Sequence, residues 1–280
     1  MFLWKILLVI YIRVVNSMKK YIYIYKSEIM TNLQYIGNLF LGFISCFMLL
    51  FIFFNLWKYI YSDPNEIIKG YTMNQTVWYV VITEVLWITL GGRKLCKKIS
   101  DDVKGGNIAY NMNKPYSYIG YTLSSTLGSC TIKGIIYIIL GLLVGLLFLG
   151  SIPNLNFISI IMVLISIILS LVINILFTMF VGLFSFVIED SGPFYWVYSK
   201  FILVLGTLFP VEYFPNVIQP FIKYSPIYAI TSGPATLFVN FSWSNCIITF
   251  IVQFIYLIIG YLLCLFIYRK GVRKLNVNGG

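Results

Sequence analysis

The sequence predicts an all-α, polytopic membrane protein, and its composition and hydropathy pattern carry that prediction. The chain is 60% hydrophobic and 10% charged, with a mean hydropathy of +0.89. Its apolar runs are long and continuous, whereas the strands of a transmembrane β-barrel alternate apolar and polar residues in short segments. No stretch between the runs is long enough to bury a separate soluble core. We therefore predict a single membrane domain.

Six apolar runs approach or exceed the roughly 20 helical residues that cross a hydrocarbon core of about 30 Å. We predict that each run is a transmembrane helix and that all six belong to one domain, residues 18–280. The predicted spans are residues 37–57, 74–91, 128–150, 157–188, 194–212 and 245–268.

The basic residues predict how these spans are oriented. Twenty Lys and Arg residues against nine Asp and Glu give a formal charge of +11. Most of the cations fall on one side of the predicted membrane, above all in the loop 93–114 and in residues 269–274. The opposite side has only Lys58, Lys69 and Lys223. Because short cytoplasmic loops are enriched in Lys and Arg, we predict a multi-pass plasma-membrane protein with both termini in the cytoplasm.

The N-terminal region divides near residue 17. Residues 1–17 are short and carry Lys5 and Arg13, so we expect an over-extended reading frame or an interfacial segment. Residues 18–36 combine basic residues with one apolar helical face, which predicts an amphipathic helix lying flat at the cytoplasmic interface. The alternative is a cytoplasmic extension of the first span. The apolar face consists of Ile22, Tyr25, Ile29, Leu33 and Ile36.

Glycine and proline mark two further features. Gly141 and Gly145 form a GxxxG pair in the third predicted span, which lets another helix approach closely without identifying that helix. Five of the nine prolines lie in residues 210–234, a stretch that is also apolar. Proline interrupts regular helix, so we predict outer re-entrant helices between the fifth and sixth spans. A plain extracellular loop is the alternative. The predicted outer gate contains Pro210, Pro215, Pro220 and Pro226.

Few motifs in the chain carry chemistry. The sequence has no GxxxxGK[ST] motif and no histidine, so it predicts neither P-loop nucleotide binding nor an HExxH zinc site. Its five cysteines contain no CxxC pair, and we predict no metal site. Glu84 is an acid inside the second predicted span, which makes it a candidate for a translocation path. The alternative is a packing contact whose polar groups are satisfied.

The loop between the second and third spans carries a recognisable pattern. Residues 99–110 read ISDDVKGGNIAY and are followed by Asn113-Lys114-Pro115-Tyr116. This order is similar to I-x-x-D-[IV]-x-x-G-x-[IL] followed by a short helix and a basic-Pro pair. The outer block 206–235 and the basic, glycine-terminated tail 268–280 agree with the same family. Over residues 18–280 the chain resembles the permease subunits of type-2 ATP-binding-cassette (ABC) exporters.

The resemblance implies a six-span permease that acts as a homo- or heterodimer and is not itself an enzyme. It implies no cofactor in this chain, because ATP would be hydrolysed by a separate ATP-binding subunit. The expected partners are that subunit, a second permease protomer and the lipid bilayer, with no nucleic acid. A helix that couples the permease to the ATPase would be formed or flanked by Asp101, Asp102, Lys104, Gly105 and Gly106. The alternative for these residues is a solvated cytoplasmic turn.

A second class of function is an ATP-independent channel or carrier, or a structural membrane protein. A channel requires a ring of charge or a polar stripe, and Glu84 and Asn174 are too few to form one. An adjacent reading frame that encodes a P-loop ATPase would distinguish the two classes. For a permease, aromatic residues such as Trp87 and Phe201 would line the path together with Glu84. This lining favours a hydrophobic or amphipathic substrate over a sugar or an ion.

Overall fold

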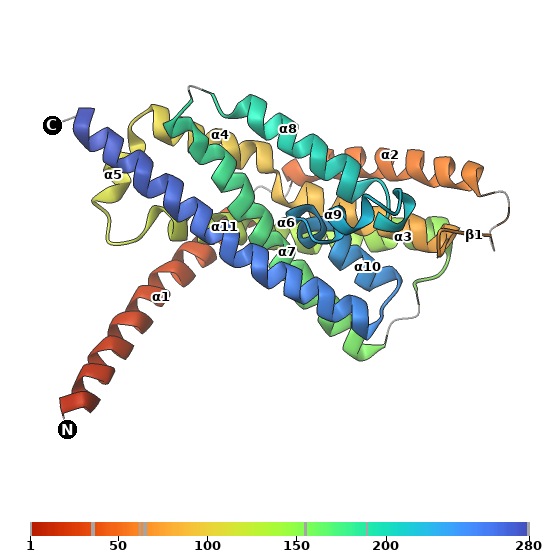
Figure 1. The fold of residues 1–280 in the computed structure, drawn as a ribbon, viewed down its shortest axis with the longest axis horizontal. Coiled ribbons are helices and arrows are strands. Elements are labelled where there is room, and N and C mark those ends of the chain that lie inside the picture. The colour runs from red at the N-terminus through yellow and green to blue at the C-terminus, as the bar shows by residue number, and fades with distance from the viewer. Residues whose placement is uncertain are drawn as a thin grey trace.

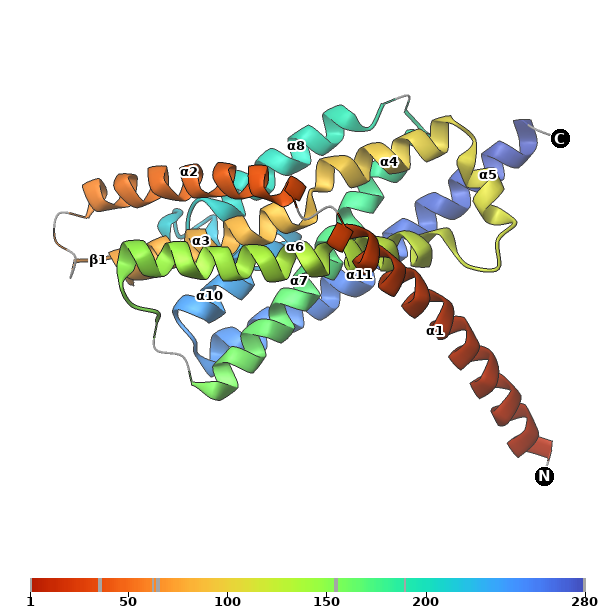
Figure 2. The same ribbon diagram turned by 180° about the vertical axis from the view of Figure 1, so that it is seen from behind.

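The computed structural model describes residues 2–34, 37–61, 63, 66–153, 156–188 and 190–278. The chain is 84% helical, which confirms the predicted all-α fold class. Figures 1 and 2 show long helices side by side in an elongated bundle, from which α1 (Phe2–Gln34) projects at one end. The remaining helices are α2 (Gly37–Ile60), α3 (Met73–Leu90), α4 (Gly92–Lys104), α5 (Asn107–Met112), α6 (Tyr118–Leu149), α7 (Phe157–Leu183), α8 (Gly192–Ile202), α9 (Gln219–Lys223), α10 (Gly233–Val239) and α11 (Trp243–Asn278).

By length and composition, three described helices could cross a membrane: Tyr118–Leu149, Phe157–Phe186 and Trp243–Arg273. They correspond to the third, fourth and sixth predicted spans, although most of their ends differ from the predicted ones. The first and second predicted spans form α2 and α3, and the fifth forms α8 and the π-helical turn Leu203–Thr207. α6 begins well before residue 128 because Ser117 caps it, its Oγ accepting a hydrogen bond from the Gly120 amide at 3.1 Å.

α3 is the central helix of the bundle, and its sequence explains where it begins. Thr72 and Gln75 form a reciprocal capping box at its first turn. A two-stranded antiparallel hairpin, β1 (Ile67–Ile68) with β2 (Tyr71–Thr72), leads into this cap from α2. Thirteen residues of α3 are buried, including Thr83 and Glu84, because α2, α6, α7 and α10 all pack around it.

The GxxxG pair joins α6 to α3 within one chain. A Cβ atom placed on Gly141 would lie 2.7 Å from Val85 Cγ2, and one placed on Gly145 would overlap the Trp78 ring. The absence of side chains at these positions is what allows the two helices to approach. The partner that the sequence left open is therefore α3.

α1 is continuous across residue 17, so the two N-terminal parts expected from the sequence form one helix. It packs against the first half of α6 through polar contacts: Tyr25 Oη lies 2.9 Å from Thr131 Oγ1, and Ser125 Oγ donates to Glu28 Oε1 at 2.8 Å. Apolar side chains such as Ile22 and Leu33 remain exposed. This arrangement agrees with an amphipathic helix, and its interfacial position stays a prediction. Ile36 of the predicted apolar face lies outside the described residues.

The proline-rich segment is broken into short pieces, as its prolines predict. It is not a plain loop, because the π-helical turn Tyr228–Ser232 and α10 are buried at every residue and pack against α3, α7 and α11. Of the predicted gate prolines, Pro210 is buried, Pro226 is half-buried, and Pro215 and Pro220 are exposed. The segment thus returns into the bundle mainly through its second half.

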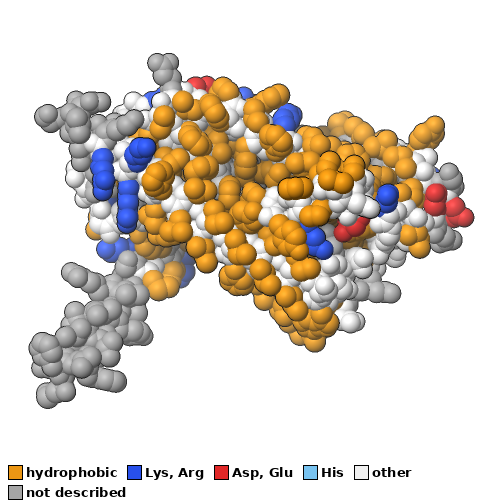
Figure 3. Space-filling model, in the orientation of Figure 1, with side chains coloured by type: hydrophobic (Ala, Val, Ile, Leu, Met, Phe, Trp, Pro, Cys, Tyr) orange, Lys and Arg blue, Asp and Glu red, His pale blue; other side chains and the backbone are white. Residues whose placement is uncertain are grey.

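Lys and Arg side chains gather at the end of the molecule where α5 and the end of α11 lie, with an extended apolar surface beyond them (Figure 3). We call this the basic end. Some Asp and Glu side chains lie near the opposite end in the same view.

Candidate functional site

The chain bends between α3 and α4, and the bend creates the candidate site at the basic end. Gly91 has a left-handed backbone conformation with φ of +58°, which glycine adopts at little steric cost. α4 then buries Leu95, Ile99 and Val103, and it exposes all of its charged residues except the half-buried Asp102. Its apolar face packs on α7, where a Cβ at Gly182 would lie 3.0 Å from Ile99 Cβ. A charged helix is therefore fixed firmly to the bundle.

The predicted coupling residues occupy the second half of α4 and the turn after it. Asp101 is exposed, whereas Asp102 is half-buried and its Oδ2 accepts a hydrogen bond from Tyr118 Oη at 2.9 Å. Gly105 ends α4, and Gly106 begins α5 with φ of +72°. Asp102 thus joins α4 to α6, while Asp101 and the two glycines face solvent.

The segment after Gly106 forms an exposed cap on the basic end. Tyr110 of α5 is 69% exposed, and Lys114 Nζ lies 4.6 Å from the centre of its ring. A hydrogen bond to Tyr116 raises the pKa of the Lys114 ammonium above its ordinary value, so this cation stays protonated at neutral pH. The loop then returns to α6 at Ser117. The cap presents aromatic, basic and amide side chains around a short helix.

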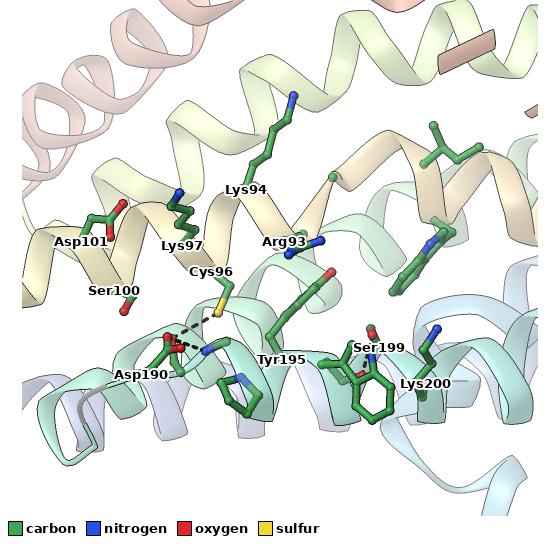
Figure 4. Close-up of a pocket in the computed structure, with 18 of the residues that line it drawn as sticks. Arg93, Lys94, Cys96, Lys97, Ser100, Asp101, Asp190, Tyr195, Ser199 and Lys200 are labelled. Carbon is green, nitrogen blue, oxygen red and sulfur yellow. Dashed lines mark hydrogen bonds between the residues drawn. The ribbon is translucent and has the colours of Figure 1, made fainter. Parts of the chain in front are cut away.

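A cleft of about 1660 Å³ lies beside α4. Its walls come mainly from the end of α3, from α4, from the middle of α6 and from α8, with Asn32 of α1 and Gly42 of α2 also in the lining. Figure 4 shows the α4 and α8 walls facing each other. Six Lys or Arg residues and two Asp residues line it, together with aromatic residues that include Trp87, Tyr137 and Trp196. The cleft therefore combines positive charge with aromatic surface.

The α8 wall is held against α4 by several contacts. Cys96 Sγ lies 3.5 Å from Ser191 Oγ, and a Cβ on Gly92 would lie 2.5 Å from Tyr195 Oη. Asp190 Oδ1 accepts from the Gly192 amide at 3.0 Å and lies 4.0 Å from Lys104 Nζ. Burial raises the pKa of the Cys96 thiol, so this side chain is protonated and serves packing.

Of the three predicted path residues, one lines the cleft. Trp87 lines the cleft. Glu84 lies one turn earlier on α3, is 2% exposed, and its Oε1 has no hydrogen-bond partner among the described residues. Phe201 of α8 is 56% exposed and is absent from the cleft lining. The structure therefore places Trp87 in the cleft lining and leaves Glu84 and Phe201 outside it.

A family model described as ABC-2 family transporter protein matches residues 43–279, which run from α2 through α11. The chain belongs to the ABC-2 family. It is thus a membrane permease of an ABC transporter, as the loop pattern and the two other sequence blocks indicated. No curated protein matches the chain. Membership in the ABC-2 family implies an ATP-binding partner.

The ABC-2 permease also contains a polar cluster at its other end that sequence reasoning missed. Tyr213 Oη lies 2.6 Å from Tyr61 Oη and 2.7 Å from Thr76 Oγ1, and Tyr61 Oη donates to the Tyr71 carbonyl at 2.9 Å. These contacts tie the proline-rich segment to α2 and α3. These residues are far apart in the sequence, so no local pattern predicts that they meet. The sequence hint was that each of the segments that meet here contains a tyrosine.

Proposed function

We propose that this ABC-2 permease is an exporter of hydrophobic or amphipathic substrates and that its ATP is hydrolysed by a separate subunit docked on α5 and the adjoining turn. The observation that supports docking is the exposed cap after Gly106, which follows a helix fixed to α7. A partner that moves the cap would also move α4, because α4 is a regular helix packed on α7. A flexible loop in the same place would not transmit that movement to the bundle.

A movement of the cap would reach the centre of the bundle through two joints. α4 continues from α3 through Gly91 and is joined to α6 through Asp102 and Tyr118. Closure of the ATPase would therefore rotate α3 and α6 together, since their glycine-mediated packing makes them one unit. In the predicted dimer, the same movement in both protomers would reorient the path between them.

Export is the direction that the cleft favours. The cleft lies at the basic end, which the distribution of Lys and Arg predicts to be cytoplasmic. A substrate would enter there and leave past the proline-rich segment, with the buried second half of that segment as the outer barrier. The Tyr213 cluster would hold the barrier closed in the resting state.

The docking proposal predicts different effects for two matched glycines. Gly106 and Gly150 both have positive φ, of +72° and +67°, and a Cβ atom added at either position would meet open space. Valine at either position costs about 1–2 kcal/mol in backbone strain. We expect Gly106→Val to reduce co-purification of the ATP-binding subunit and substrate-stimulated ATP hydrolysis severalfold, and Gly150→Val to preserve co-purification. Equal co-purification with both variants would contradict docking at the cap.

A further inference from the structure

The cleft beside α4 presents cations and aromatic rings to the same space. Arg93, Lys94 and Lys97 are exposed on α4, the helix that follows the Gly91 bend. Trp87 is half-buried near the end of α3, and Tyr137 is 5% exposed on α6, one turn beyond Lys133. A ligand in the cleft therefore meets both positive charge and aromatic surface.

The positive charge in the cleft is largely unbalanced. Asp190 lies 4.0 Å from Lys104 Nζ and accepts a hydrogen bond from the Gly192 amide. Asp101 is the other carboxylate in the lining. Clefts lined by charge of one sign concentrate the field and attract ligands of opposite charge. The six cations of the lining are Arg93, Lys94, Lys97, Lys104, Lys133 and Lys200.

Lys133 is the most informative of these cations. It is half-buried near the middle of α6, a helix with a mean hydropathy of 2.5 over its most apolar window. Among the described residues it has no carboxylate within 4.0 Å. A charge in such a helix is expensive unless it faces a solvated cavity or a partner of opposite charge, and Lys133 faces this cleft. The chain thus maintains an unpaired cation where an anion can reach it.

We propose that the cleft binds the anionic head group of an amphiphile, with the apolar part of the ligand against Trp87 and Tyr137. A phosphate or carboxylate accepts charge-assisted hydrogen bonds from Lys94, Lys97 and Lys133, which lie on two walls of the cleft. Figure 4 shows the side chains of Lys94 and Lys97 extending from α4 away from the α8 wall. Basic pockets between membrane helices at the cytoplasmic side are suited to such head groups.

This inference rests on the proposed export function and narrows its substrate to anionic amphiphiles. A free inorganic anion shares the head-group chemistry, but it would leave the aromatic wall uncovered. A neutral amphiphile would cover that wall and leave Lys133 unpaired. The combination of both surfaces in one cleft is what favours an anionic amphiphile.

Native mass spectrometry of the purified permease tests the proposal. The protein is titrated with phosphatidylglycerol and, separately, with phosphatidylcholine of the same acyl chains. We expect phosphatidylglycerol to bind the wild-type chain more tightly, and K94Q/K97Q/K133Q to lower that affinity by about tenfold or more, since one charge-assisted contact is worth about that factor. The matched control K26Q/K98Q/K270Q removes the same charge outside the cleft and should change the affinity less than twofold.

Two single variants test the same proposal in case the triple variant misfolds. Lys97 and Lys98 are consecutive exposed residues of α4, and Lys97 lines the cleft whereas Lys98 lies 5.8 Å from the Tyr121 ring. K97Q should weaken phosphatidylglycerol binding and K98Q should not. Equal losses with both, equal wild-type binding of both lipids, or full displacement of phosphatidylglycerol by millimolar inorganic phosphate would overturn the proposal.

The lipid-binding proposal and the docking proposal can be rejected separately. Lipid binding is measured on the permease alone, and co-purification of the ATP-binding subunit is measured with the same variants. Lost lipid selectivity with intact co-purification would reject the anionic amphiphile and keep the export function. Intact lipid selectivity without any ATP-binding partner would keep the anionic amphiphile and reject the ATP-driven export function.

Discussion

At the scale of single residues, two adjacent acids have different roles. Consecutive residues on an α-helix point about 100° apart, so Asp101 faces the cleft while Asp102 reaches Tyr118 on α6. Sequence reasoning treated the two acids as one coupling element. The structure makes Asp102 a link between α4 and α6 and leaves Asp101 available to solvent and ligands.

This difference predicts separable effects on stability. We expect Asp102→Asn and Tyr118→Phe each to lower the free energy of unfolding by about 1 kcal/mol, because each weakens a hydrogen bond to a charged acceptor that is half-buried. The double variant should lose little more than either single variant, since both act on one contact. Asp101→Asn should stay within about 0.5 kcal/mol of wild type. Thermal melting in detergent measures the stability of all four variants. If the stability lost by the double variant equals the sum of the losses of the two single variants, the Asp102–Tyr118 hydrogen bond does not explain those losses.

At the scale of helices, the bundle depends on close contact between α3 and α6. Gly141 and Gly145 lie against Val85 and Trp78, so this face of α6 is used inside the protomer. Other faces of α6, with Ile139 and Leu147 exposed, remain apolar. The interface between protomers in the predicted dimer must therefore be formed by other surfaces than the GxxxG pair.

Gly145→Val tests this contact. The added side chain would overlap the Trp78 ring, and such overpacking costs about 1–3 kcal/mol. We expect a melting temperature several degrees below that of wild type, with the oligomeric state unchanged. Leu146→Val on the neighbouring exposed position provides the control and should melt close to wild type. Loss of a dimer without loss of protomer stability would assign the pair to the protomer interface instead.

At the scale of the whole molecule, the basic end and the opposite end, where the β1–β2 hairpin lies (Figure 1), correspond to the two predicted sides of the membrane. Lys97 lies at the basic end on α4, and Lys69 lies in the turn of the hairpin between α2 and α3. The five native cysteines are buried, so they should react slowly with a polar maleimide. Labelling of the protein by the maleimide would therefore report mainly on a cysteine introduced at the surface.

We expect Lys69→Cys to react with a membrane-impermeant maleimide in intact cells and Lys97→Cys to react only after permeabilisation. The physical reason is the excess of Lys and Arg at the basic end, which favours its retention in the cytoplasm. Gel shift of the labelled protein measures both reactions. The opposite labelling pattern would invert the topology and place the cleft outside, which would remove the argument for export.

Several features of the fold and site were predictable because they are local. The capping of α3 by Thr72 and Gln75, the interruption of helix by the 210–234 prolines and the charge of α4 all depend on neighbours within a few residues. The loop pattern at 99–110 identified the family for a similar reason, since its residues are consecutive. The start of α6 was placed too late because the apolar run begins after the helix does.

The sequence by itself determined the membrane class, the helical content, the excess charge at one end and the family of the permease, because hydropathy, charge and short motifs are properties of consecutive residues. Only the tertiary structure decided that Lys133 and Lys97 line one cleft, that Tyr213 meets Tyr61 and Thr76, and that the GxxxG pair contacts α3. Each of these contacts joins different helices, and its existence depends on how the helices rotate and cross. Hydropathy fixes which residues enter the bundle, while packing between helices fixes which of them meet.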